Sequence, residues 1–211
     1  MASSQQKTLF FLTLLSSSLA IFQMASAGDT DIISDFILPS NITGPVDGNF
    51  FTFTGMRSLI GAQLPENFRI SKACITEFPV LIGQGVSLAF LQFPTGSLNP
   101  PHTHPRSAEL FFLIEGSLEV GFTDTMNKLY KQTLQAGDIF MFPKGLVHFQ
   151  YNHDGKKPAT AISSFGSPNP RTVSLALNLF TTAIDDDILA KVLKTDVVTT
   201  KFLRANFVPK L

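Results

Sequence analysis

Two segments hold three of the four histidines of this chain: Gly96-SLNPPHTHPRSAELFFLIE-Gly116 and Gly137-DIFMFPKGLVHFQY-Asn152. In the first segment, His102 and His104 are two residues apart, so on a β-strand both imidazoles lie on the same face. Glu109 follows a turn that contains a proline, so the next strand can bring its carboxylate back beside the two rings. Glycines and prolines frame both segments, as expected where strands end in turns. The first segment therefore predicts three side chains directed at one point.

The second segment supplies a third imidazole. His148 lies in an alternating stretch, Val147–Tyr151, where it faces away from its apolar neighbours. Three neutral imidazoles and one carboxylate are a usual ligand set for a first-row divalent metal. The sequence thus predicts a metal site made by His102, His104, Glu109 and His148. The alternative, that these are ordinary surface-loop residues, leaves the spacing and the Gly/Pro framing of both segments as coincidence.

Four protein ligands leave two positions open on an ion that prefers six, as a catalytic site requires. The ligand types do not choose among Mn, Fe, Co, Ni, Cu and Zn. Gln150 and Asn152 are the nearest polar candidates to orient the ligands, although a turn at the strand end explains Asn152 equally well. His153, beside Asp154-Gly155, is expected to be exposed in a loop.

Composition favours one globular domain. The chain has 211 residues, a formal net charge of zero, 21 phenylalanines and no tryptophan, so phenyl rings are expected to fill the core. A domain of this length buries about 70% of its unfolded surface. The chain has no excess of basic residues, which a nucleic-acid-binding protein typically has, so no nucleic-acid partner is predicted.

The first 27 residues have the features of a secretory signal peptide. Lys7 is their single charge, an apolar and serine-rich run follows, and Ala25-Ser26-Ala27 is a small-x-small cleavage site. Cleavage after Ala27 leaves a mature chain of residues 28–211. The apolar run is short and interrupted by Ser16-Ser17-Ser18, and no later stretch reaches the roughly 20 apolar residues of a membrane span. The mature protein is therefore predicted to be secreted, without a membrane span.

From Asn49 onward the pattern is mostly that of β-strands. The expected strands are 50–54, 85–93, 118–122, 128–134, 139–142, 147–151 and 159–165. Many short strands separated by turn signals indicate a sandwich or barrel. Near the end, 185–194 and 196–206 are expected to form two short helices, the first with acids at its start and lysines at its finish.

Both histidine segments resemble the two motifs of the cupin superfamily, in the form found in plant germins and germin-like proteins. The resemblance runs from about Asp47 to the C-terminus and rests on Gly48-NFFTFTG, Asn99-PPHTHPR, Asn127-KLY and Gly145-LVHFQYN. It implies an all-β, single-domain cupin jelly-roll β-barrel with short C-terminal α-helices. The expected division is a signal peptide at 1–27, an N-terminal arm at 28–48, the cupin barrel at 49–180 and a C-terminal helical extension at 181–211.

The resemblance also implies properties that the residue patterns do not show. These are one manganese ion per subunit, a homohexamer built as a trimer of dimers whose C-terminal helices clasp neighbouring subunits, location in the apoplast or cell wall, and an association with plant defence and stress. Its activities act on small anionic substrates: oxalate oxidase converts oxalate and oxygen, and superoxide dismutase disproportionates superoxide.

Two positions bear on the choice between these activities. The oxidase branch of the family has an asparagine on the strand before the first motif, where this chain has Ala89. The second asparagine of the substrate pocket is present as Asn99. Because alanine cannot donate a hydrogen bond, oxalate oxidation is expected to be weak or absent. Superoxide dismutation is then the leading hypothesis, and a non-enzymatic wall or receptor-like binding protein is the alternative; other cupin chemistry, such as a dioxygenase or sugar isomerase, fits less well.

Cysteine content departs from the family pattern. Germins typically have two cysteines near the mature N-terminus joined in a disulfide, but here the matching stretch 34–39 has none and Cys74 is the only cysteine. No internal disulfide is possible, so the arm must be held by packing or by a partner chain. Cys74 is predicted to be a buried small hydrophobe, with an intermolecular disulfide or a reactive thiol as alternatives. Asn41-Ile42-Thr43 is a sequon for N-glycosylation.

Overall fold

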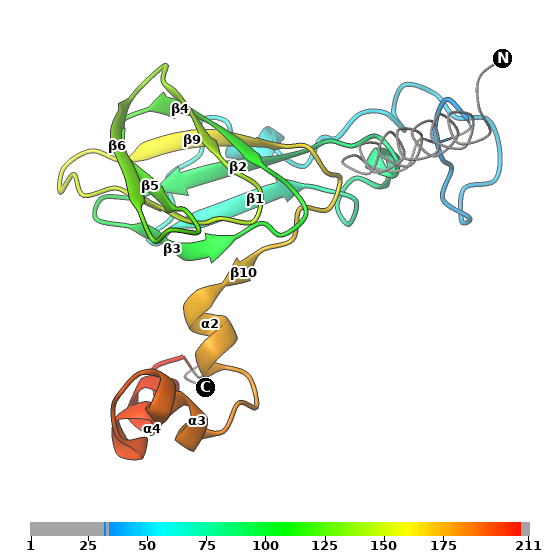
Figure 1. Ribbon diagram of the computed structural model, residues 1–211. Helices are drawn as coiled ribbons and strands as arrows, with labels where there is room; N and C mark the ends of the chain where they lie inside the picture. Colours follow the sequence, from blue (N-terminus) through cyan, green and yellow to red (C-terminus); the bar gives the residue numbers. More distant parts are fainter. Residues whose placement is uncertain (1–31, 33, 208–211) are drawn as a thin grey trace, which may run out of the picture.

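Two five-stranded antiparallel sheets form the body of the protein in the computed structural model, which describes residue 32 and residues 34–207 (Figure 1). The first sheet has the order β1-β2-β9-β4-β7, with bounds Arg69–Ala73, Ser87–Phe93, Ala159–Phe165, Glu109–Glu115 and Ile139–Phe142. The second has the order β10-β3-β8-β5-β6, with bounds Val173–Ser174, Leu98–Thr103, Val147–Tyr151, Ser117–Thr123 and Leu129–Gln135. The all-β prediction is confirmed, and the expected signal peptide lies outside the described residues.

The core lies between the two sheets and follows from alternation along the strands. In β4, Phe111 and Leu113 are fully buried while Phe112 between them is 39% exposed. Phenyl rings of Phe93, Phe111 and Phe142 are among the largest fully buried side chains, as the composition predicted. The inner faces of the sheets therefore pack as a phenylalanine-rich layer.

Strand register brings the histidine segments together at one level of the barrel. His102 on β3 pairs with His148 on β8, and Glu109 at the start of β4 pairs with Phe142 on β7 and Phe165 on β9. The β3–β8 ladder is irregular between Asn99 and His102, where Pro100 and Pro101 lack the N–H groups that a regular ladder uses.

The stretch 50–54 does not form a strand, which corrects the sequence prediction. Its backbone makes turns, with Phe50 N–H donating to Asp47 at 3.1 Å and Thr52 N–H donating to Asn49 at 3.1 Å. The phenyl rings pack on one another instead, as in the edge-to-face pair of Phe50 and Phe51 with centroids 5.0 Å apart. High β-propensity did not produce a strand because the segment has no neighbouring strand to pair with.

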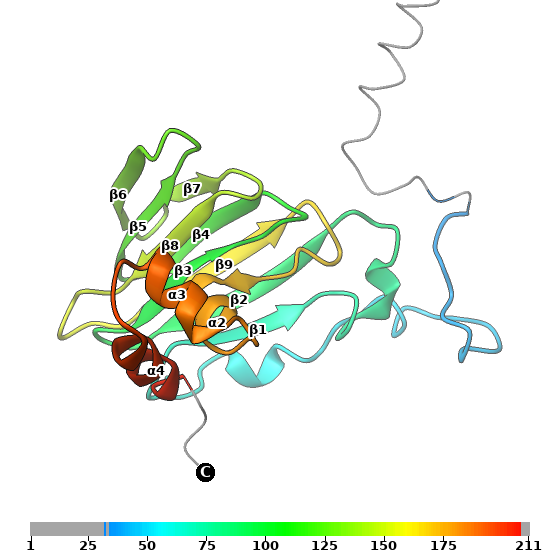
Figure 2. The ribbon, with the colours of Figure 1, turned by 60° about the horizontal axis from the view of Figure 1, so that its bottom comes forward.

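The C-terminal helices project from the barrel beyond β10 (Figures 1 and 2). They are α2 (Leu175–Phe180), α3 (Asp186–Val192) and α4 (Val197–Ala205). Two short 3₁₀ helices lie earlier in the chain: η1 (Arg57–Leu59) precedes β1, and η2 (Pro79–Leu81) lies between β1 and β2. The two predicted helices correspond to α3 and α4, whereas α2 was not predicted. Asp196 caps α4 by accepting a hydrogen bond from Thr199 N–H at 2.9 Å.

Arg204 on α4 joins the three helices. Its guanidinium donates to the Asp186 carboxylate at 2.9 Å and to the backbone carbonyls of Phe180, Thr182 and Ile184. This fan of charge-assisted hydrogen bonds gives the small helical unit an anchor that its limited core does not supply. Within the described residues, no helix has the length and apolar character needed to cross a membrane.

Candidate metal centre

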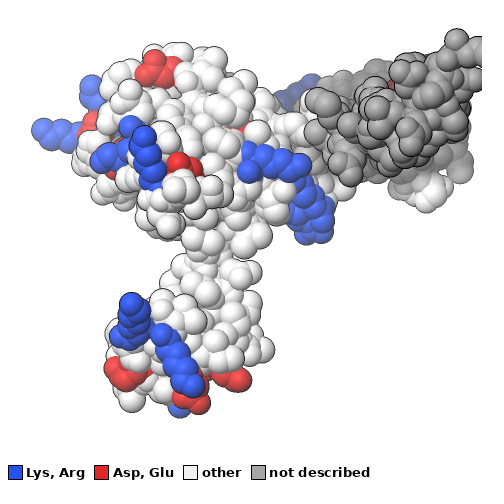
Figure 3. Space-filling model, in the orientation of Figure 1, with Lys and Arg blue, Asp and Glu red and all other residues white. Residues whose placement is uncertain are grey.

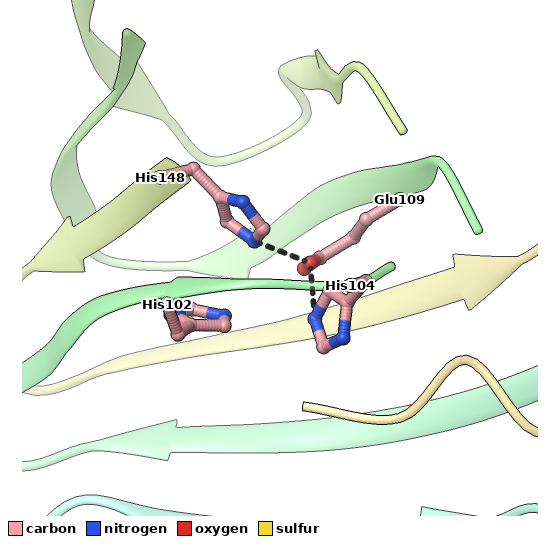
Figure 4. Close-up of side chains that lie close together, drawn as sticks. All are labelled: His102, His104, Glu109 and His148. Atoms are coloured by element: carbon pink, nitrogen blue, oxygen red, sulfur yellow. Dashed lines mark hydrogen bonds and ion pairs between the residues drawn. The ribbon is translucent and has the colours of Figure 1, made fainter. Parts of the chain in front are cut away.

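Four buried side chains meet inside the barrel (Figure 4). His102 lies on β3, His104 just beyond its end, Glu109 at the start of β4 and His148 on β8, and each is between 2% and 4% exposed. One possible ligand atom from each residue lies within 4.8 Å of the others. Glu109 Oε2 is 3.1 Å from His104 Nε2 and 3.1 Å from His148 Nε2. The structure therefore brings together all four residues that the sequence predicted as metal ligands.

A backbone carbonyl holds each imidazole by its other nitrogen. His102 Nδ1 donates to Pro100 O at 2.8 Å, His148 Nδ1 donates to Leu146 O at 2.9 Å, and His104 Nδ1 donates to Arg171 O. A carbonyl oxygen only accepts hydrogen bonds, so each Nδ1 carries the proton and each Nε2 has its lone pair free. Contacts of this kind fix the ring orientation and the tautomer that a metal requires.

Glu109 is oriented by a hydroxyl from β9. Ser163, which is fully buried, donates from Oγ to Glu109 Oε1 at 2.5 Å. Oε1 is thereby occupied, and Oε2 faces the imidazoles. Sequence reasoning missed Ser163, although it lies on the inward face of β9 with Ala161 and Phe165, and a buried hydroxyl on that face signals a polar partner.

The protonation states of these four side chains favour binding of a cation. Burial and, to a smaller extent, the charge of His148 lower the pKa of His102 to about 4, so His102 is neutral at pH 7. Burial alone would raise the pKa of Glu109, but the imidazoles of His104 and His148 beside it outweigh burial and hold this pKa far below its usual range. An ionised carboxylate therefore faces the imidazole nitrogens.

These features fit a divalent metal. With Nδ1 protonated on His104 and His148, the Nε2 lone pairs point at the Glu109 carboxylate across 3.1 Å. Lone pairs at this separation repel unless a proton or a metal ion lies between them. Three nitrogens and one oxygen suit a first-row ion, and their buried negative charge favours a cation over an empty site.

Asn99 and Gln150 contact each other at the edge of the site. Asn99 Nδ2 donates to Gln150 Oε1 at 2.6 Å, and Asn99 lines the small cavity beside the ligands. Gln150 is fully buried on β8, and among the described residues its Nε2 finds no hydrogen-bond partner.

The remaining candidate residues lie away from the cavity that contains the ligands. Asn152 donates from Nδ2 to the carbonyls of Phe93, Pro94 and Lys157. These hydrogen bonds stabilise the turn at the end of the strand. His153 and Asn41 are exposed. Cys74 is only partly buried, and its thiol donates to Glu77 Oε2 at 2.7 Å, which differs from the apolar packing expected for it.

The Cupin family model matches residues 63–201 of the chain. Putative germin-like protein 9-2 of Oryza sativa subsp. japonica is 52% identical over 191 residues, which cover 88% of each chain. Germin-like protein 9-3 of the same organism is 48% identical over 99% of this chain and 98% of the relative.

The chain is a germin-like member of the cupin family. Among solved structures, recombinant oxalate oxidase in complex with glycolate superposes with a TM-score of 0.74 at 30% identity, covering 86% of this chain and 98% of that one. The two sheets of this germin-like protein are accordingly those of the cupin jelly roll.

Removal of the Ser163 hydroxyl is expected to weaken metal binding. In Ser163→Ala, Glu109 Oε1 loses its donor and the carboxylate is free to rotate, so metal affinity should fall about 10- to 100-fold. A competition titration against a chelator measures the change. The matched control is Ser164→Ala, because Ser164 is exposed on the opposite face of β9. Equal affinities for the two variants would contradict the assigned role of Ser163.

The metal-free protein is expected to lose stability as the pH falls from about 6.5 to about 4. His102 takes up a proton near pH 6.5 when unfolded but only near pH 4 when folded, so the unfolded state binds more protons in this interval. The full shift corresponds to about 3 kcal/mol. The lowered pKa of Glu109 acts in the same direction below pH 4.5.

Urea unfolding at several pH values tests this dependence. His102→Gln should flatten the slope, and an unchanged slope in this variant would show that another group is responsible. Bound metal should also leave over the acidic range, because protons compete for the imidazoles. Metal retained at equilibrium at about pH 3 would contradict the three-histidine assignment.

Proposed function

We propose that this germin-like protein is a secreted, manganese-dependent superoxide dismutase. The observation that carries the proposal is the buried convergence of His102, His104, Glu109 and His148, three of which line a cavity of about 70 Å³. A cavity of this size admits small molecules and excludes extended ones. Manganese, one ion per subunit, is the metal that the family resemblance implies.

His102, His104, Glu109 and His148 would hold the ion, which would supply a one-electron redox couple. In dismutation, one superoxide loses an electron to give oxygen, and a second gains an electron and two protons to give hydrogen peroxide. The carbonyl-anchored rings and Ser163 keep the ligand set in one geometry, so little reorganisation accompanies each electron transfer.

Oxalate is disfavoured by the polar groups around the cavity. Ala89 is 1% exposed and has no side-chain donor, although it lines the outer cavity that leads toward His104. Asn99 uses its amide N–H toward Gln150 at 2.6 Å. A dianion entering this site thus lacks the amide donor at position 89, and one of the two N–H groups of Asn99 is already engaged.

Exposed apolar side chains support the proposal of a homohexamer. On the outer face of β4 and β7, Phe112 is 39%, Ile139 61% and Met141 51% exposed, and on the C-terminal helices Val198 is 77% and Phe202 67% exposed. The helices stand away from their own barrel, so their apolar faces are available to another subunit (Figures 1 and 2).

Other parts of the proposal concern location and partners. We place the protein in the apoplast or cell wall, with a role in defence or stress and a glycan on the exposed Asn41. On the face shown in Figure 3, basic and acidic side chains are scattered among uncharged ones, which supports the expectation that nucleic acid is not a partner.

Dismutase activity is expected with manganese and not with zinc. Zinc occupies a comparable ligand set but has no accessible second oxidation state. Superoxide consumption should be measured per bound metal for the secreted protein loaded with each ion. His148→Ala should abolish activity, whereas His153→Ala, which removes an exposed histidine, should not. Inactivity of the fully manganese-loaded protein would favour the non-enzymatic binding protein instead.

Oxalate oxidation by the manganese-loaded protein is expected to be weak or absent. Hydrogen peroxide release from oxalate should be compared in wild type and in Ala89→Asn, where an amide donor is restored beside the cavity. A gain in oxalate turnover in Ala89→Asn, at equal manganese content, is the predicted result. Robust turnover by the wild type would contradict the assignment.

A further inference from the structure

Two cavities meet at the metal centre. The inner one, of about 70 Å³, is lined by His102, His104 and Glu109 among other residues, and the outer one, of about 280 Å³, is lined by His104 alone of these three. They share the side chains of Ile70, Lys72, His104, Phe165 and Thr172. Because all four ligands are buried, a substrate must come through such a space, and the outer cavity is the larger route to His104.

Lys72 is placed where the two cavities join. It lies on β1, two residues after Ile70, so both side chains are on the same face of the strand, and both line the inner and the outer cavity. Of the residues that line the inner cavity, Lys72 is the only charged one outside the metal-binding group. Its flexible four-carbon stem can carry the ammonium group toward the ligands or back to the rim.

The neighbour of Lys72 across the ladder is Ala89. The two residues form a direct Cα pair between β1 and β2, and both line the outer cavity. Side chains paired in this way have Cβ atoms about 5 Å apart, so a methyl group at position 89 leaves space that the lysine side chain can enter. The position that lacks an amide donor is therefore directly beside a cation.

Arg171 adds a second cation at the outer cavity. Its backbone carbonyl accepts the His104 Nδ1 hydrogen bond, and its φ of 57° places that carbonyl while the side chain remains exposed. Glu77 is the one acidic residue that lines the outer cavity, and its carboxylate already accepts hydrogen bonds from the thiol and the N–H of Cys74. Glu77 offsets one of the two cations, so the charged side chains of the lining keep an excess of positive charge.

We propose that Lys72 is the anion-binding residue of this site, with Arg171 drawing anions to the outer cavity. The substrate class is a small monoanion of about two or three heavy atoms, since the inner cavity has room for only a few water-sized groups. This inference rests on the proposed function for its substrate. In this proposal, Lys72 holds the anion by its charge. The family's oxidase branch instead has an asparagine amide at the position of Ala89.

Azide binding to the manganese-loaded protein tests the proposal, with a spectroscopic titration at low and at physiological ionic strength. Lys72→Met keeps the length of the stem and removes the charge, so the dissociation constant for azide should rise about tenfold at low salt. The difference from wild type should shrink as salt screens the charge. Lys72→Arg should remain close to wild type, and Lys201→Met, on the exposed surface of α4, is the matched control.

Arg171→Asn removes the second cation while keeping a residue that tolerates a positive φ, so the His104 anchor stays in place. A smaller rise in the azide dissociation constant, about threefold, is expected. Manganese content is measured first for every variant, and Lys72→Gln replaces Lys72→Met if the latter does not load the metal. Unchanged azide affinity and salt dependence in the neutral Lys72 variant would overturn the proposal, as would equal losses in Lys72→Arg.

The result separates this proposal from the proposed function. If azide affinity depends on Lys72 but the loaded wild type does not consume superoxide, the anion site stands and the dismutase assignment fails. If the wild type dismutates superoxide and Lys72→Met matches it in azide affinity and in salt dependence, the dismutase assignment stands and the role of Lys72 fails.

Discussion

A carboxylate buried among three imidazoles is the constraint on which the rest of this structure depends. Glu109 is 2% exposed, and an isolated charge at that depth would be strongly unfavourable. Ser163 satisfies one oxygen, and His104 and His148 face the other. The barrel must therefore place four strands, β3, β4, β8 and β9, in one register, because a slip of one residue would turn each of these side chains to the wrong face.

The backbone contributes as much to the site as the side chains do. Each imidazole is held by a carbonyl that is freed from regular sheet pairing: Pro100 lies in the irregular part of β3, Leu146 precedes β8, and Arg171 precedes β10. Two of these carbonyls are only two residues from their histidines, while that of Arg171 is far along the chain. The irregular positions thus supply the acceptors that fix the tautomers. In a fully paired ladder, these carbonyls would be bonded to the neighbouring strand instead.

The charge environment explains how one ligand set can serve different chemistry. The ligands are those that the germin resemblance implies, and the cavity around them contains the differences: Ala89 without a donor, Asn99 engaged by Gln150, and Lys72 across the ladder from Ala89. Binding groups around a metal decide which anion is held and in what orientation. Under the proposed function, selectivity would depend on Lys72 of β1, Ala89 of β2 and Asn99 of β3, which surround the ligand set.

Sequence alone pointed to the four side chains that the fold brings together, and to most of the strands. The spacing of His102, His104 and Glu109 and the alternation in Val147–Tyr151 are local patterns, and the periodicity of a strand fixes which residues share a face. Local propensity failed at 50–54, where aromatic residues pack as rings in turns, and it did not reveal the short helix α2.

Only the tertiary structure decided which groups surround the ligands. Ser163 donates to Glu109 across 54 positions of sequence, Arg171 holds His104 across 67, and Lys72 lies beside Ala89 through strand pairing. Such contacts depend on the register between strands and on the course of loops, which are set by packing of the whole barrel. The sequence pattern therefore predicted the four residues that meet at the candidate metal site, and the fold determined what holds them and what surrounds them.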